Sequence, residues 1–163
     1  MRRYFGACEG EGGRRGSRPA GSGPDGGRAA PRAMASLIFD TTFLIDYQRE
    51  RSRGPGKAHE FLREHATDAA FLPVTAYGEW AEGFTDRTEP AFVSLVQSFE
   101  LLPVTRPVAD VYAQTVRDLR ARGQLIGAND LWIAATALEK DWPLVTRNLK
   151  EFSRVTGLRC LSY

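Results

Sequence analysis

Short apolar runs alternate with helical patterns along the chain from Ser36 onward. The runs are three to five residues long, and most of them end at a proline, threonine or aspartate, which is typical of buried strands. They predict five strands, at Leu37–Asp40, Ala69–Leu72, Leu101–Thr105, Leu144–Thr146 and Leu158–Leu161. Between them, apolar residues recur at the spacing of an amphipathic helix, for example Phe92, Leu95, Val96 and Phe99.

This spacing and its breakers predict helices between successive strands. Thr75 is a candidate N-cap for the helix that contains Glu79, and Asn129 is a candidate N-cap for a later helix that is apolar nearly all round. The predicted helices cover about Thr42–Arg51, Lys57–Ala66, Ala76–Gly83, Phe92–Phe99, Pro107–Arg122, Asp130–Lys140 and Leu149–Arg154. Strand–helix alternation of this kind predicts an α/β protein with three layers, α/β/α, around a central, mostly parallel sheet of about five strands.

Composition and charge divide the chain at Met34. Residues 1–33 are rich in Gly and Arg and carry seven arginines against three acids, whereas residues 34–163 hold 15 basic and 17 acidic residues, a net charge of −2. We expect residues 1–33 to be disordered, with Met34 a candidate start and residues 34–163 the folded domain. An RGG-like arm that adds RNA affinity is the functional alternative for this segment. The folded part is not a broadly basic nucleic-acid binder.

The cysteines and the hydropathy of the chain indicate the cellular compartment of the protein. Cys8 and Cys160 are far apart and outside any CxxC pattern, which argues against a zinc site or a disulfide framework and suits the reducing cytoplasm. No apolar run reaches the roughly 18 residues that a membrane span needs. We therefore expect a cytoplasmic protein without a membrane segment.

Three acidic residues stand out on this predicted scaffold. Asp40 ends the first strand, Glu79 lies on the helix after the second strand, and Asp130 starts the apolar helix. The carboxyl ends of parallel strands share one edge of a sheet, where open α/β folds place their ligands. For Asp130, simple capping of the helix dipole is the alternative interpretation.

Three converging carboxylates would repel one another, and at least one would stay protonated at neutral pH. A divalent hard cation, Mg²⁺ or Mn²⁺, relieves this repulsion and leaves coordination positions for water and phosphate. Such a site predicts hydrolysis of a phosphodiester by metal-activated water.

The chain resembles PIN-domain ribonucleases, specifically the VapC-type toxins of type II toxin–antitoxin pairs. The resemblance rests on four motifs and their order: DTTFLID at Asp40, TAYGEWAEGF around Glu79, GQLIGANDLWIAATAL around Asp130, and LVTRNLKEF at 144–152. It implies a PIN domain over residues 34–163 that acts as a Mg²⁺- or Mn²⁺-dependent endoribonuclease on RNA, often tRNA or rRNA. It also implies a homodimer that is neutralised by a VapB-like antitoxin.

The resemblance implies roles for seven residues. Asp40, Glu79 and Asp130 would be the catalytic, metal-binding acids, and the hydroxyls of Thr41, Thr42 and Thr146 would orient a carboxylate or a bound water; ordinary turn chemistry is the alternative for the threonines. Asn148 stands where the family often has a fourth acid, so its carbonyl oxygen is a weaker candidate metal ligand, and the number of metals, one or two, stays open. Glu151 either compensates for the missing charge or lies on a solvated helix face.

Three other functions are alternatives to the nuclease. A catalytically weak or inactive PIN module that binds RNA or a partner protein is the main alternative, and Asn148 is the feature that favours it. A haloacid-dehalogenase-type phosphatase needs an Asp two residues after Asp40, where the chain has Thr42, and a receiver domain needs an Asp at the end of the third strand, where the chain has LLPVT. Both of these enzyme classes are excluded at specific positions.

Overall fold

The computed structural model describes residues 34–163. The prediction of disorder for residues 1–33 lies outside this part of the chain. The described residues form a five-stranded sheet in the order β3-β2-β1-β4-β5, and all four strand pairings are parallel. The strands are β1 (Ser36–Phe39), β2 (Ala69–Pro73), β3 (Glu100–Leu102), β4 (Leu144–Val145) and β5 (Cys160–Leu161).

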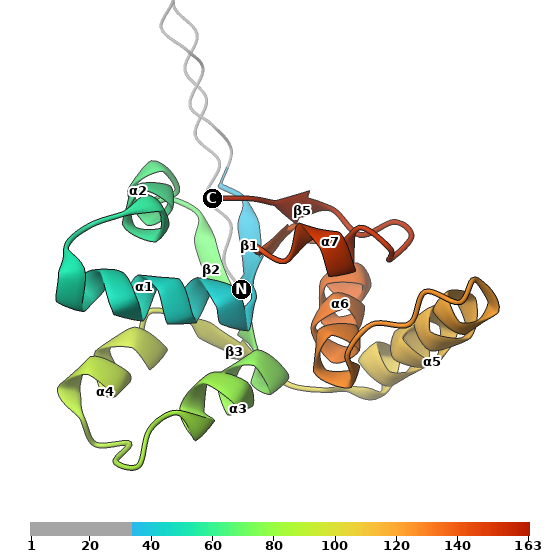
Figure 1. Ribbon diagram of the computed structural model, residues 1–163, viewed down its shortest axis with the longest axis horizontal. Coiled ribbons are helices and arrows are strands. Elements are labelled where there is room, and N and C mark those ends of the chain that lie inside the picture. The colour runs from blue at the N-terminus through green and yellow to red at the C-terminus, as the bar shows by residue number, and fades with distance from the viewer. Residues whose placement is uncertain (1–33) are drawn as a thin grey trace, which may run out of the picture. The chain divides into compact units, whose positions relative to one another are not determined.

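Helices follow the strands as the alternating pattern predicts. They are α1 (Thr41–Arg53), α2 (Lys57–Glu64), α3 (Val74–Glu82), α4 (Pro90–Val96), α5 (Arg106–Ala121), α6 (Ala128–Lys140) and α7 (Leu149–Phe152). In the view of Figure 1, α1, α2 and α4 lie on one side of β1 and β2, and α5 and α6 lie on the other. The predicted three-layer α/β/α architecture with a parallel sheet is confirmed.

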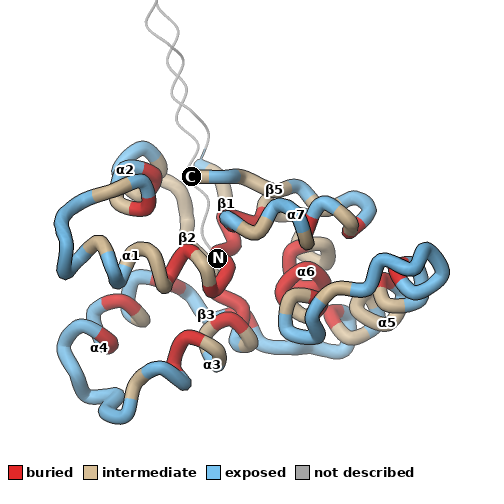
Figure 2. The backbone as a smooth tube through the Cα atoms, in the orientation of Figure 1, coloured by how far each residue is buried: buried red, intermediate tan, exposed pale blue. Residues whose placement is uncertain are grey.

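The core forms where the central strands meet α1 and α6. Leu37, Ile38 and Phe39 of β1 are at most 1% exposed, as expected for a strand with neighbours on both edges and helices on both faces. Figure 2 shows the same burial along β1 and through α6, whose residues 133–137 are all buried. The apolar character of the helix that contains Asp130 is thus explained by its central position.

Several predicted boundaries were wrong. Thr75 does not cap α3, because the helix already begins at Val74 with Pro73 as its N-cap, and the Thr75 hydroxyl is buried without a hydrogen-bond partner within residues 34–163. Asn129 does not cap α6, whose N-cap is Gly127, so Asp130 is the third helical residue and not the first.

The third strand was also misplaced. It spans Glu100–Leu102 and not Leu101–Thr105, because Thr105 turns out of the sheet and caps α5 by accepting a hydrogen bond from the Val108 N–H. Within residues 34–163, no helix is both long enough and apolar enough to cross a membrane.

Candidate active site

Asp40 lies between the end of β1 and the start of α1, and its carboxylate is held by three donors. The side chain is buried at 2% exposure. Its Oδ1 accepts the Thr41 N–H at 2.7 Å, which caps α1, and its Oδ2 accepts the hydroxyls of Thr42 and Thr146, each at 2.7 Å. A buried carboxylate needs such donors to offset its lost hydration. The two hydroxyls therefore fix the orientation of Asp40 at the carboxyl edge of the sheet.

Glu79 reaches the same edge from the second turn of α3. Its Oε2 accepts the Thr41 hydroxyl at 2.6 Å, and its Oε1 accepts the Asn129 side-chain amide at 2.6 Å. Thr41 thus lies between the two acids, because its N–H binds Asp40 and its hydroxyl binds Glu79. Hydrogen bonds to ionised carboxylates are short and strong, so these contacts join α1, α3 and α6.

Asp130 occupies the first turn of α6 and is half-buried. Burial raises the pKa of Asp130 to about 6, and the negative charges of Asp40, Glu79 and Glu151 add to the increase. Together with Glu79, residues 127–130 line a cavity of about 250 Å³. A Cβ added at Gly127 would stand 3.5 Å from the Asp130 Oδ2, an ordinary contact distance, so Gly127 lies directly beside this carboxylate.

Asn148 lies just before α7, and its backbone N–H donates to the Thr146 hydroxyl at 2.9 Å. Its side-chain amide makes no hydrogen bond within the described part of the chain. Glu151 forms an ion pair with Arg154 at 2.7 Å and is also near enough to Asp130 to raise the pKa of that carboxyl. Glu151 thus adds charge to the cluster while its own charge is partly neutralised.

The structure therefore brings all of the predicted site residues to one edge of the sheet. Asp40, Thr41, Thr42, Glu79 and Thr146 are connected by direct hydrogen bonds, and Asp130 by its electrostatic interaction with Asp40 and Glu79. In residues 34–163, however, no three acidic, His or Cys side chains are grouped tightly enough to form a ready metal site. The carboxylates of Asp40 and Glu79 are turned toward hydroxyl and amide donors instead.

The donor set fits a hard divalent cation in its chemistry. It consists of carboxylate oxygens, which Mg²⁺ and Mn²⁺ prefer, and the charges of Asp40 and Glu79 add to the effect of burial in raising the pKa of Asp130. Positive charge at this edge would relieve that repulsion.

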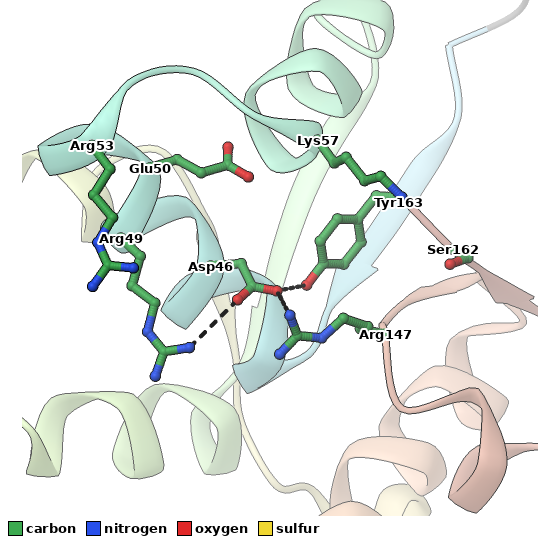
Figure 3. Close-up of a pocket in the computed structure, with 8 residues that line it drawn as sticks. All are labelled: Asp46, Arg49, Glu50, Arg53, Lys57, Arg147, Ser162 and Tyr163. Atoms are coloured by element: carbon green, nitrogen blue, oxygen red, sulfur yellow. Dashed lines mark hydrogen bonds and ion pairs between the residues drawn. The ribbon is translucent and has the colours of Figure 1, made fainter.

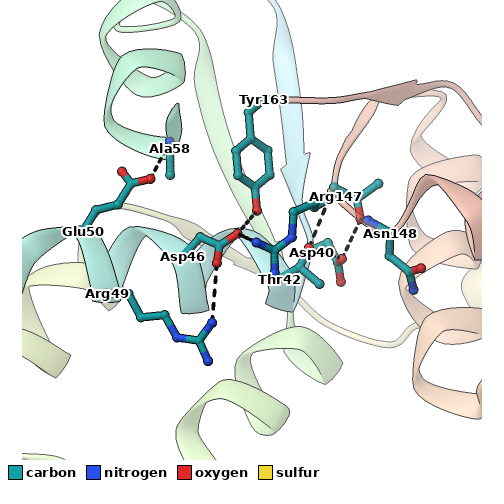
Figure 4. Close-up of polar contacts among 10 residues, drawn as sticks. Asp40, Thr42, Asp46, Arg49, Glu50, Ala58, Arg147, Asn148 and Tyr163 are labelled. Atoms are coloured by element: carbon teal, nitrogen blue, oxygen red, sulfur yellow. Dashed lines mark hydrogen bonds and ion pairs between the residues drawn. The ribbon is translucent and has the colours of Figure 1, made fainter. Parts of the chain in front are cut away.

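Two features of the site were missed in the sequence. Asn129, predicted as an N-cap, donates to Glu79 instead, and no local pattern distinguishes these two uses of an asparagine. Asp46 accepts the Tyr163 hydroxyl at 2.9 Å and pairs with the Arg147 guanidinium at 2.7 Å (Figure 4). These partners are about a hundred residues from Asp46 in sequence, so only the sheet topology brings them together.

The fold and the site together indicate one class of protein. It is a parallel α/β/α domain that carries acidic residues from three segments at one edge of its sheet. The family model described as the PIN domain matches residues 37–158, and the chain belongs to this family.

Curated relatives place the chain more narrowly, with the VapC group. The chain is 46% identical over 127 residues to Ribonuclease VapC1 of Haemophilus influenzae strain R2866, which covers 75% of this chain and 93% of the relative. It is 38% identical over 135 residues to Ribonuclease VapC1 of Rickettsia felis, covering 77% of this chain and 95% of the relative.

A solved structure supports the same fold. The structure of VapBC2 from Rickettsia felis, bound to a DNA fragment from its promoter, superposes with a TM-score of 0.71 at 20% identity. The match covers 78% of this chain and 98% of that chain. At this level of identity the likeness bears on the fold alone.

Proposed function

We propose that this chain is a divalent-metal-dependent endoribonuclease toxin that a VapB-like antitoxin neutralises. The observation that carries the proposal is the convergence of Asp40, Glu79 and Asp130 from three segments, with the pKa of Asp130 raised by burial and by the other two charges. Membership of the PIN family and similarity to proteins named Ribonuclease VapC support the same activity.

In this proposal Asp40, Glu79 and Asp130 hold Mg²⁺ or Mn²⁺, with the Asn148 carbonyl oxygen as a further ligand. When bound, the cation supplies an acidified water and positive charge beside the scissile phosphate. The hydroxyls of Thr42 and Thr146 hold the Asp40 carboxylate, and Thr41 and Asn129 hold the Glu79 carboxylate, so the acids are oriented before substrate arrives.

The partners follow from the same family. The substrate is RNA, with tRNA or rRNA as the expected target, and the protein acts in the cytoplasm as a homodimer. The solved relative from Rickettsia felis is a complex named VapBC2, which supports an antitoxin partner for this chain.

The decisive experiment is RNA cleavage by the purified full chain, freed of any partner, in Mg²⁺ or Mn²⁺ and in EDTA. Asp40→Asn is assayed alongside, because it removes a charge from the centre of the site at nearly constant volume. We expect cleavage that depends on metal and disappears in the variant.

Either of two results would refute the proposal. Equal cleavage by Asp40→Asn and wild type would place the chemistry elsewhere. Absence of cleavage with tRNA and rRNA, in protein shown to be folded and to bind Mn²⁺, would favour the alternative of a PIN module that binds RNA or a partner without cutting.

A further inference from the structure

A cavity of about 470 Å³ opens beside the acid cluster, between α1, the start of α2 and the end of the chain (Figure 3). Six charged side chains line it: Asp46, Arg49, Glu50, Arg53, Lys57 and Arg147. Four of these are cations and two are carboxylates, although residues 34–163 as a whole carry a net charge of −2. The cavity is therefore a local basic site, here called the basic pocket, on an acidic domain.

Both carboxylates of the basic pocket are already engaged. Asp46 accepts the Tyr163 hydroxyl, pairs with Arg147 at 2.7 Å and lies 3.8 Å from Arg49. Glu50 accepts backbone N–H groups of Gly56, Ala58 and His59 and contacts the His59 ring at 2.8 Å. These hydrogen bonds outweigh the effect of burial and lower the pKa of Glu50. Neither carboxylate is available to Arg53 or Lys57.

Arg53 and Lys57 are both exposed, and within residues 34–163 neither has a carboxylate within salt-bridge distance. The α1 dipole accounts for Arg53, because cations are favoured in the last turn of a helix. It does not account for Lys57, which is the first residue of α2, where the helix dipole disfavours a cation. Arg49 and Arg53 are also spaced i, i+4, an arrangement in which like charges repel. Arg53 and Lys57 are therefore two cations of the basic pocket that no carboxylate within residues 34–163 pairs with.

The basic pocket is joined directly to the candidate active site. The Arg147 guanidinium lines the pocket, and its backbone N–H donates at 3.3 Å to the Thr42 hydroxyl, which in turn donates to Asp40 (Figure 4). Arg147 thus connects the basic pocket to the Asp40 side chain through Thr42.

We propose that the basic pocket binds the backbone phosphates of the RNA strand that flanks the scissile bond, through Arg53 and Lys57 with Arg49 and Arg147. This inference rests on the proposed function, because it assigns a second part of the same substrate site. The planar guanidinium forks bind phosphate oxygens in pairs, and the lysine ammonium acts as a point charge. An acidic domain that cuts a polyanion needs such a local attraction to overcome its own repulsion.

The test removes the two unpaired charges and measures RNA binding by the full chain as a function of salt. The variant is the double substitution Arg53→Gln/Lys57→Gln. The probes are a fluorescein-labelled oligouridylate and bulk tRNA, both in EDTA, with a gel to show that the RNA stays intact. Residues 1–33 are common to all variants, so their contribution cancels in the comparison.

The expected effect follows from counterion release. Each single-strand phosphate contact contributes about 0.7 to the slope of log K against log salt, so losing two lowers the slope by about 1.4. Relative to 1 M salt, this corresponds to a loss of about 60-fold in affinity at about 50 mM salt and about 14-fold at about 150 mM.

Two matched variants separate the basic pocket from general charge effects. Arg87→Gln/Arg120→Gln removes two exposed cations that lie in neither the basic pocket nor the acid cluster, and should change the slope little. Arg53→Lys/Lys57→Arg keeps both charges in place and should keep the slope of wild type.

The inference is overturned if the pocket variant and the Arg87/Arg120 variant have the same slope and affinity. If metal-dependent cleavage by wild type persists in that case, the proposed function stands and only the pocket assignment fails. Wild type that neither binds nor cuts RNA overturns both. An unchanged RNA slope with weaker binding of the purified antitoxin would show that the pocket takes an acidic peptide instead.

Discussion

Replacing Asp130 by asparagine should stabilise the metal-free protein, because folding buries this carboxylate and places it near the charges of Asp40, Glu79 and Glu151. The ordinary pKa of an Asp side chain, 3.8, rises to about 6 in the fold. At 1.36 kcal/mol per pH unit, the difference of about 2.2 corresponds to about 3 kcal/mol at neutral pH. Solvent screening of a half-buried group reduces this to about 1.5 kcal/mol. Losing a charge that the α6 dipole favours costs about 0.5 kcal/mol. The expected net gain is about 1 kcal/mol.

The sign of the pH dependence follows from the raised pKa. Between about pH 4 and pH 6 the folded protein binds more protons at Asp130 than the unfolded chain, so stability falls as pH rises through this window. The asparagine variant lacks this titration. Its advantage over wild type should therefore be about 1 kcal/mol at pH 7.5 and only about 0.3 kcal/mol at pH 5, where about half of the electrostatic penalty is relieved.

The assay is urea unfolding of wild type and Asp130→Asn in EDTA at both pH values. Asp110→Asn, an exposed position on α5, is the matched control and should stay within about 0.5 kcal/mol at either pH. Added Mg²⁺ should raise the stability of wild type but not of Asp130→Asn, by about 2.7 kcal/mol at a hundredfold excess over Kd. A variant that is less stable than wild type at pH 7.5, or a difference that does not change with pH, would refute the electrostatic account of the cluster.

Three further substitutions test the contacts around Asp40 and the end of the chain. Asp40→Asn should abolish cleavage and lower the free energy of unfolding by about 1–3 kcal/mol, because an amide cannot accept all three donors; cleavage at the wild-type rate would contradict the site. Thr146→Val should lower the free energy of unfolding in urea by about 1–3 kcal/mol and slow cleavage, because it removes a donor to Asp40 and the acceptor of the Asn148 N–H. Unchanged stability would show that water replaces the hydroxyl. Tyr163→Phe should lower the free energy of unfolding by about 1 kcal/mol, because the hydrogen bond to Asp46 is lost, and cleavage should stay near the wild-type rate. A large loss of cleavage would reveal a role for Tyr163 in the reaction.

The order of elements and the position of Asp40 were predictable from the sequence, because both depend on local patterns. The run of Leu37, Ile38 and Phe39 marks a buried strand whatever its neighbours are, and Asp40 is the first polar residue after it. The errors arose where two local interpretations compete. Thr75 and Asn129 are both good cap residues by type, yet the helices begin two residues earlier than predicted, at Val74 and Ala128, and residue type alone does not fix a helix start to within a residue or two.

Contacts between distant segments were not predictable in the same way. The Asp46–Tyr163 hydrogen bond joins residues 117 positions apart, and Arg147 meets Asp46 across a similar separation. Glu151, for which a surface position was one of two interpretations, acts on Asp130 while paired with Arg154. Each of these contacts depends on strand order, which hydrophobic patterns do not encode.

Strand order also explains why the acids meet at Asp40 and not at another strand end. The chain runs from β1 outward to β2 and β3, then crosses back to β4 on the other side of β1. Open α/β sheets bind ligands at such a reversal, where the loops on the two sides diverge and leave a crevice. Asp40 ends the strand at the reversal, so α3 brings Glu79 from the β2 side and the end of β4 brings Thr146 from the other. The Thr41 hydroxyl donates to Glu79 and the Thr146 hydroxyl to Asp40, so a double-mutant cycle between these two side chains should show coupling only through the orientation of Asp40.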